Sequence, residues 1–244
     1  MTSHPQQSED PPKKVAIITG ASQGIGAGLV AGYRRAGYAV VGVSRSVRHP
    51  DEEDYVGIAG DVADPDTARR AVGTSLDRFG RVDTLVNDAG IYIGKPFSEY
   101  TLDEYNAITA VNLAGFFHMS QQAIAPMVSQ GSGHIVNLST SLAEHADSKR
   151  PAALPSLTKG GLVAVTRSLA IEYASRGVRV NAVSLGVIKT PLNPPDSYQG
   201  LAEVHPLGRL GDISDVVDGI LYLEQASFVT GEILHIDGGQ SAGN

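Results

Sequence analysis

The sequence lacks cysteine entirely, which excludes disulfide bonds, thiolate catalysis and cysteine-ligated metal sites. Its seven histidines show neither a His-x-x-x-His nor a His-Glu-x-x-His spacing, so no metal site is predicted. No apolar run approaches the roughly 18 residues that a membrane-spanning helix needs. Basic residues are not in excess either, and the formal net charge is −7. Nucleic-acid binders usually carry a basic face, so neither a nucleic acid nor a membrane is an expected partner.

The composition is that of an ordinary α/β protein. Hydrophobic residues make up 42% of the 244 positions, which suffices for one domain with a sizeable core. The first residues are polar and proline-rich and have no apolar stretch of the kind found in a signal peptide. We therefore expect a flexible N-terminal tail over residues 1–12, one domain over residues 13–244, and a cytoplasmic protein.

A glycine-rich turn lies between an apolar run, residues 15–18, and a helical pattern, residues 27–35. Gly20 permits a tight reversal at positive φ, Gly24 lets backbone N–H groups approach an anion, and Gly26 lets the helix pack on the strand. The N-terminus of that helix offers N–H groups and a positive dipole end to a phosphate. The turn thus predicts dinucleotide binding. The expected contacts are Gly20, Ser22, Gln23, Gly24, Ile25 and Gly26.

The end of the second predicted strand, residues 38–44, indicates which dinucleotide is bound. An acid at this point binds a free ribose 2′-hydroxyl, whereas an arginine accommodates a 2′-phosphate. Here Ser44 and Arg45 occur and no acid does, which favours NADP over NAD. Stacking on adenine or exposure to solvent is the alternative role for Arg45. After the third strand, Asp61 and Val62 are expected at the adenine, although Asp61 also suits a helix N-cap.

Later motifs extend this pattern over residues 14–241. Asn-Asp-Ala-Gly follows the fourth strand at 87–90, Asn112 lies in a helical pattern, and Gly-His-Ile-Val-Asn at 133–137 leads into Leu-Ser-Thr. Together with Thr-Gly-x-x-x-Gly-Ile-Gly, these motifs resemble the short-chain dehydrogenase/reductase family. The resemblance implies a single-domain Rossmann-type fold, a doubly wound, mostly parallel seven-stranded sheet with helices on both faces. It also implies further cofactor contacts, at Asn87, Ala89, Gly90, Lys159, Ile188 and Thr190.

The family's active site combines Asn, Ser, Tyr and Lys. Tyrosine exchanges a proton with the substrate oxygen, lysine binds the nicotinamide ribose and lowers the tyrosine pKa, serine steadies the substrate oxygen, and asparagine holds a water. By resemblance Asn112, Thr140 and Lys159 occupy three of these positions, threonine replacing serine. The fourth differs, because the residue one helical turn before Lys159 is Pro155, which cannot exchange a proton. The segment from Thr140 to Lys159 is also slightly longer than is usual in the family.

This substitution changes the predicted substrate. Hydride transfer to a ketone creates an alkoxide that needs a proton donor, whereas hydride transfer to an iminium cation yields a neutral amine. We therefore expect an NADP(H)-dependent reductase of a small iminium or hemiaminal substrate. Three residues are alternatives as substitute acids for an ordinary carbonyl or alcohol oxidoreductase: His145, Tyr92 and Tyr198. A catalytically weakened, regulatory cofactor-binding protein is the remaining alternative.

Residues 190–209 are rich in proline and glycine, which predicts a lid over the substrate. Apolar residues such as Leu192 and Tyr198 in this lid suggest a ring-bearing substrate. By resemblance to the family, and from the apolar pattern of residues 116–124, we expect a homotetramer or a homodimer.

Overall fold

The apolar runs of the sequence form the strands of one sheet in the computed structural model, which describes residues 12–46 and 52–243. Except for Pro12, the predicted tail lies outside these residues. The strands run in the order β3-β2-β1-β4-β5-β6-β7, and every neighbouring pair is parallel. The predicted seven-stranded sheet is confirmed. Its strands are β1 Val15–Thr19, β2 Ala39–Ser44, β3 Tyr55–Ala59, β4 Thr84–Asn87, β5 Gly133–Thr140, β6 Val178–Leu185 and β7 Ile233–Ile236.

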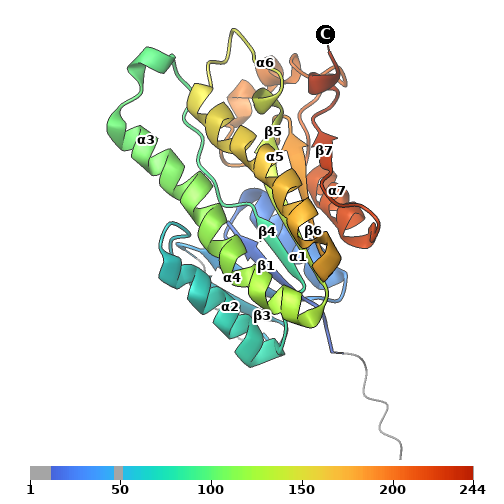
Figure 1. Ribbon diagram of the computed structural model, residues 1–244. Helices are drawn as coiled ribbons and strands as arrows, with labels where there is room; N and C mark the ends of the chain where they lie inside the picture. The colour runs from blue at the N-terminus through green and yellow to red at the C-terminus, as the bar shows by residue number, and fades with distance from the viewer. Residues whose placement is uncertain (1–11, 47–51, 244) are drawn as a thin grey trace, which may run out of the picture.

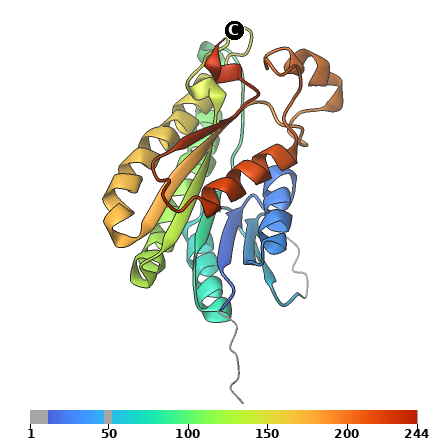
Figure 2. The ribbon, with the colours of Figure 1, turned by 90° about the vertical axis from the view of Figure 1, so that its right-hand side faces the viewer.

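Helices cover both faces of this sheet. In Figures 1 and 2, α2, α4 and α5 lie on one face and α1 and α7 on the other, while the short α6 stands above the carboxyl ends of the strands. A π-helical turn, Ala110–Ala114, joins α3 to α4. The helices are α1 Gly24–Arg35, α2 Pro65–Phe79, α3 Leu102–Thr109, α4 Gly115–Gln130, α5 Ala153–Tyr173, α6 Tyr198–Ala202 and α7 Ile213–Gln225.

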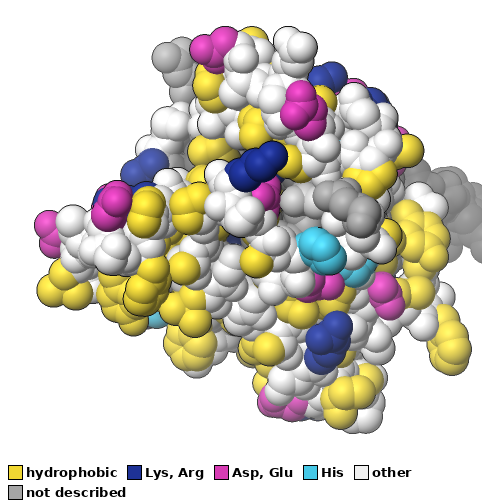
Figure 3. All heavy atoms as spheres, turned by 90° about the horizontal axis from the view of Figure 1, so that it is seen from above, with side chains coloured by type: hydrophobic (Ala, Val, Ile, Leu, Met, Phe, Trp, Pro, Cys, Tyr) yellow, Lys and Arg dark blue, Asp and Glu magenta, His cyan; other side chains and the backbone are white. Residues whose placement is uncertain are grey.

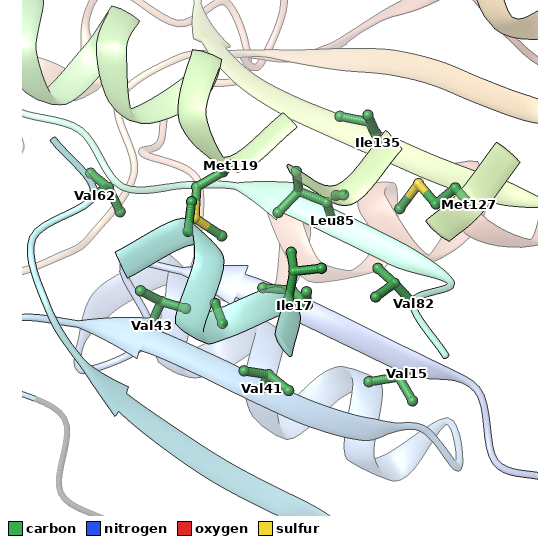
Figure 4. Close-up of a cluster of buried hydrophobic side chains, with 14 of the residues drawn as sticks. Val15, Ile17, Val41, Val43, Val62, Val82, Leu85, Met119, Met127 and Ile135 are labelled. Atoms are coloured by element: carbon green, nitrogen blue, oxygen red, sulfur yellow. The ribbon is translucent and has the colours of Figure 1, made fainter. Parts of the chain in front are cut away.

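The strands are apolar throughout because both faces of the sheet are covered. Along β1, Val15 and Ile17 join the core on the side of α2, α4 and α5, whereas Ala16 and Ile18 join the core beneath α1 and α7. Figure 4 shows the first core, where Met119 and other side chains of α4 meet the sheet. This double burial fixes the strands, and therefore the positions of the loops at their carboxyl ends.

Two helix boundaries follow signals in the sequence, and a third does not. Asp64 caps α2 by accepting a hydrogen bond from the Asp66 N–H at 2.9 Å, and Thr101 and Glu104 form a capping box on α3. The start of the long helix α5 has no side-chain cap. Helix α5 begins at Ala153, so Pro155 occupies its first turn, where a proline is tolerated.

The order of the strands creates a switch point between β1 and β4. The chain leaves β1 towards β2 and β3 on one side, and it returns through β4 towards β5, β6 and β7 on the other. Open α/β sheets bind ligands at the carboxyl end of such a point. Among the described residues, no helix is long and apolar enough to cross a membrane, and no cluster of side chains suits a metal ion.

Candidate active site

A cavity of about 460 Å³ opens at the carboxyl ends of the strands, over the switch point. One end is formed by the ends of β2 and β3, and the other by the segments that follow β4, β5 and β6. Figure 3 shows this face of the molecule from above. Its basic side chains are scattered and form no continuous patch, while hydrophobic side chains occur all over it.

The glycine turn has the backbone geometry that a phosphate site requires. Gly20 and Gly24 have φ values of 73° and 56°, which strongly favour glycine. A Cβ atom on Gly26 would lie 2.3 Å from the Gly20 carbonyl oxygen, so this residue permits the close packing expected of it. At the start of α1, Gln23 provides no side-chain cap and the first turn has no acid. The N-terminus of α1 is therefore available to an anion.

Thr19 connects this turn to the end of β4. Its Oγ1 atom accepts hydrogen bonds at 3.0 Å from the N–H groups of both Asp88 and Ala89. Gly90 comes next, and a Cβ atom there would lie 3.0 Å from Lys159 Nζ. A larger residue would press on the end of the lysine side chain, so glycine favours this close approach. The predicted residues Ala89 and Gly90 consequently line the cavity beside Lys159.

Asp88 and Lys159 are two opposite charges in the cavity wall. Burial raises the pKa of Asp88 to about 7, although the Lys159 charge and the Gly26 N–H both act to lower it. Burial likewise lowers the pKa of Lys159 to about 8, against the raising effect of Asp88. The Lys159 ammonium donates to the Leu138 carbonyl at 2.8 Å. Both groups therefore titrate near neutral pH, and Lys159 remains mostly cationic at pH 7.

Asn112 lies behind the cavity wall and holds two segments together. It accepts a hydrogen bond from the Ile91 N–H at 2.9 Å and donates to Ile91 O and Thr158 Oγ1, each at 3.1 Å. The side chain is buried and does not line the cavity. The π-helical turn at residues 110–114 places Asn112 between these partners. In the structure Asn112 therefore positions the segment after β4 against α5.

The substrate end of the cavity contains a hydroxyl but no phenol at the family's tyrosine position. Thr140, at the end of β5, lines the cavity, and its Oγ1 accepts from the Leu142 N–H at 3.4 Å. The neighbouring Ser139 hydroxyl is committed to the Lys159 carbonyl at 2.9 Å. Pro155 is buried and also lines the cavity. Thr140 and Lys159 thus both line the cavity, and Pro155 lies in the first turn of the helix that carries Lys159.

The adenosine end of the cavity carries the other predicted contacts. Ser44, Arg45, Asp61 and Val62 all line it. Ser44 Oγ is buried and has no hydrogen-bond partner among the described residues, which leaves it available to a ligand. Asp61 Oδ1 accepts from the Ala63 N–H at 3.0 Å, so this carboxylate also stabilises the turn before α2. The uncapped α1, the unpaired hydroxyl and Arg45 fit an anionic dinucleotide.

Two predicted cofactor contacts, Gly26 and Asn87, do not line the cavity. The side chain of Asn87 lies inside the protein, where it donates to Ser120 Oγ at 3.1 Å and to Asn137 Oδ1 at 2.9 Å. Asn137 continues this chain to Thr166 Oγ1 at 2.9 Å. The Asn87 side chain faces α4 rather than the cavity because alternate residues of a strand face opposite sides. The predicted residues that line the cavity are Gly20, Ser22, Gln23, Gly24, Ile25, Ser44, Arg45, Asp61, Val62, Ala89, Gly90, Thr140, Lys159, Ile188 and Thr190.

The structure distinguishes the three alternative acids by their access to the cavity. Tyr92 lines the cavity, whereas His145 and Tyr198 do not. Burial raises the pKa of Tyr92 above its usual value, so its phenol is protonated at neutral pH. In the lid, Leu192 reaches the cavity.

The predicted lid segment, residues 190–209, contains a histidine that no sequence signal pointed out. His205 Nε2 accepts from the Val187 N–H at 3.0 Å, and the Nδ1 atom lies 3.1 Å from the Leu201 carbonyl of α6. Burial lowers the pKa of His205, which favours the neutral ring that can accept at one nitrogen and donate at the other.

The chain is similar to known proteins along almost its whole length. Residues 20–241 match the family model described as "Enoyl-(Acyl carrier protein) reductase". The 3-oxoacyl-[acyl-carrier-protein] reductase FabG of Salmonella typhimurium is 32% identical over 237 residues, which cover 93% of this chain and 96% of that protein. The 2,5-dichloro-2,5-cyclohexadiene-1,4-diol dehydrogenase LinX of Sphingobium indicum is 33% identical over 245 residues, with 94% and 97% covered. The solved structure of ElxO with NADP bound has a TM-score of 0.88 at 29% identity, and it covers 95% of this chain and 100% of that one.

A parallel doubly wound sheet with a glycine turn and an uncapped helix at its switch point defines a dinucleotide-binding protein. More narrowly, the chain belongs to the short-chain dehydrogenase/reductase family, as its motifs predicted, and it is an oxidoreductase.

Proposed function

We propose that this protein is an NADP(H)-dependent reductase of a small cyclic substrate, and that it reduces a C=N bond in preference to a simple ketone. The observation that carries the proposal is Pro155, which is buried in the cavity wall one helical turn before Lys159. A proline has no group that can protonate a developing alkoxide. Arg45 at the end of β2, and the NADP in the similar ElxO structure, support NADP(H) as the cofactor.

The proposed reaction needs no proton from the protein at the hydride step. NADPH, when bound, supplies the hydride and leaves as NADP⁺. The iminium carbon accepts this hydride, the electron pair of the C=N bond becomes the nitrogen lone pair, and the product is a neutral amine. The proton that converts an imine into its iminium form comes from water beforehand. A hemiaminal that loses water yields the same iminium.

The chain's own residues bind and orient the reactants. The start of α1 and the glycine turn bind phosphate, Ser44 and Arg45 bind the adenosine end, and the Lys159 ammonium is proposed to bind the nicotinamide ribose. The Thr140 hydroxyl oxygen, at the end of β5, accepts a hydrogen bond from the iminium N–H of the substrate. Holding the reacting atoms in place in this way supplies much of the rate enhancement of a hydride transfer.

The experiment compares matched substrates of similar ring size. We expect the purified protein to oxidise NADPH with the cyclic imine methylpyrroline and to do so at least about 100-fold more efficiently, by kcat/KM, than with cyclopentanone. NADH should be the poorer cofactor. Equal or faster reduction of the ketone would overturn the preference for C=N bonds while leaving the oxidoreductase assignment intact.

A carbonyl reductase with another proton donor is the second candidate, and Tyr92 is the observation that favours it. Its phenol is the single alternative acid that lines the cavity among those the sequence suggested. If Tyr92 protonates a substrate oxygen, Tyr92→Phe should abolish ketone reduction and leave imine reduction almost unchanged.

We also propose that the protein assembles as a homodimer or a homotetramer, and that it is located in the cytoplasm. Phe117 of α4 and Ile171 of α5 support the first proposal, because their side chains are 52% and 82% exposed on helices that cover the sheet. Light scattering coupled to size-exclusion chromatography gives the mass of the assembly. A monomer at micromolar concentration would contradict this proposal.

A further inference from the structure

The loop between β5 and α5 brings a second cation to the substrate end of the cavity. Arg150 lines the cavity, and its Nη1 atom is buried without a hydrogen-bond partner among the described residues. The Arg150 backbone N–H donates to the Asp147 carbonyl at 3.1 Å, so a turn of this loop fixes the position of the residue. A guanidinium is always charged, and leaving one of its N–H groups buried and unpaired is costly. A ligand that accepts a hydrogen bond from Nη1 would remove this cost.

The surroundings of Arg150 place it near the substrate rather than near the adenosine. Burial raises the pKa of Tyr92 and lowers that of His205, and the Arg150 charge acts to lower the pKa of both. Tyr92 follows β4, and His205 binds the segment that follows β6. Arg45, the other cavity-lining arginine, lies at the end of β2.

The charges at this end of the cavity restrict the substrate further. The charged residues that line it there are Asp88, Lys159 and Arg150. Because the pKa of Asp88 is raised to about 7, mainly by burial, one carboxyl that is only partly ionised at neutral pH opposes two cations. A substrate with a lone positive charge would be repelled by this excess. A substrate that carries its own negative group would be attracted.

We propose that Arg150 binds a carboxylate group of the substrate, so that the substrate is a cyclic imino acid rather than a neutral imine. This inference rests on the proposed function and names its substrate class. The planar guanidinium matches a carboxylate, which can accept two parallel N–H bonds. In the iminium form such a substrate is a zwitterion, and its carboxylate offsets the positive charge that the cavity would otherwise disfavour. Arg150 orients the ring and takes no part in the transfer of hydride.

A binding experiment tests this assignment without requiring turnover. Protein saturated with NADP⁺ is titrated in a calorimeter with pyrrole carboxylate, a planar mimic of a cyclic imino acid, and with the matched pyrrole carboxamide. A pyrrole phosphonate is the third ligand, because a phosphate group offers the same anionic oxygens. We expect the carboxylate to bind about tenfold to a hundredfold more tightly than the carboxamide, and more tightly than the phosphonate.

The variants separate a substrate contact from a structural role. Arg150→Gln should remove the preference for carboxylate over carboxamide, and Arg150→Lys should retain part of it. Lys149→Gln is the matched control, because it removes the same charge from an exposed neighbour in the same loop. Unchanged affinity of each variant for NADP⁺ shows that the fold is intact.

Three results would overturn the inference. Arg150→Gln could bind the carboxylate as tightly as the unaltered protein does. It could instead lose the carboxylate and the carboxamide equally, which is what a structural role produces. Tighter binding of the phosphonate would exclude a carboxylate as the preferred group. Since no hydride is transferred in these measurements, failure of imine reduction in the activity assay would be a separate outcome.

Discussion

Replacing Pro155 by tyrosine should give the protein a ketone reductase activity. The residue lies in the first turn of α5, and both Pro155 and Lys159 line the cavity of about 460 Å³. Residues four apart share one face of a helix, so a tyrosine hydroxyl at this position would extend beside the Lys159 ammonium. A proline in the first helical turn contributes little that another residue cannot replace. We therefore expect Pro155→Tyr to fold.

The size of the gain follows from what a proton donor contributes. General acid catalysis is worth about 10²- to 10⁴-fold, or roughly 3–5 kcal/mol of the barrier. Burial lowers the pKa of Lys159 to about 8, so at pH 7 the lysine is mostly cationic and would lower the pKa of a neighbouring phenol. We expect kcat/KM for cyclopentanone to rise at least about 100-fold. Imine reduction should change little, because its hydride step leaves no alkoxide to protonate.

The assay follows NADPH consumption with both substrates, and Pro155→Phe is the matched control, since it adds the ring without the hydroxyl. The gained activity should fall as the pH rises through about 8 and Lys159 loses its proton. Equal ketone reduction by the tyrosine and phenylalanine variants would refute the reasoning. Fast ketone reduction by the unaltered protein would also refute it, because a donor would then already be present.

Three further changes test other parts of the structure. Gly26→Ala should abolish NADP⁺ binding in calorimetry, because its Cβ would lie 2.3 Å from the Gly20 oxygen, whereas Gly73→Ala in α2 meets nothing within 4 Å and should raise the melting temperature slightly. Burial raises the pKa of Glu224, but its hydrogen bonds and the electrostatic interaction with His134 outweigh burial and lower the pKa from 4.5 to about 2. The carboxylate therefore contributes about 3 kcal/mol to the free energy of unfolding, which is present above pH 4.5 and lost as the pH falls towards 2. Urea titrations should show a weaker acid dependence for Glu224→Gln. Lys159→Met should weaken NADP⁺ binding at pH 7 by about tenfold and remove the part of the change in affinity between pH 7 and 9 that comes from Lys159 losing its proton; an unaltered affinity at pH 7 would exclude a cofactor contact.

The partners of Glu224 explain why its carboxylate remains ionised. It accepts hydrogen bonds from Thr84 Oγ1 at 2.9 Å and from the phenols of Tyr33 and Tyr38 at 3.2 and 3.1 Å, and His134 Nδ1 lies 2.9 Å away. Burial lowers the pKa of His134 despite this carboxylate. A neutral ring that donates from Nδ1 and accepts from Asn181 at Nε2 satisfies both contacts.

Much of the fold was predictable because its signals are local. The strands are continuous apolar runs, and the glycine turn carries its function in the backbone, where a positive φ and a close approach leave no choice of residue type. Asp64 at the start of α2 is also a local signal, because its side chain caps the helix. By contrast, the start of α5 has no side-chain cap, so no residue before Ala153 marks it.

The candidate site was less predictable where the orientation of a side chain depends on the tertiary structure. Asn87 and Asp88 are neighbours, yet the first lies in the interior and the second in the cavity wall, and this choice depends on which side of β4 faces α4. Arg150 was visible only as one of several charged residues in a lengthened loop. The burial of its Nη1 atom depends on the fold of the loop between β5 and α5, which no periodic pattern encodes.

Because β1 lies between β2 and β4, the cofactor site is complete only after segments that are distant in the sequence have folded together. Ala16 pairs with Thr84, far along the sequence, and the cavity collects residues from Gly20 to Asn193. During synthesis the middle of the sheet closes late, and a chain that has not reached β6 has no complete nucleotide site. NADP(H) thus binds the folded chain and not its partly made forms. At 100 times its Kd, such a ligand adds about 2.7 kcal/mol to the free energy of unfolding. The cellular pool of the cofactor therefore helps to determine how much of the protein remains folded.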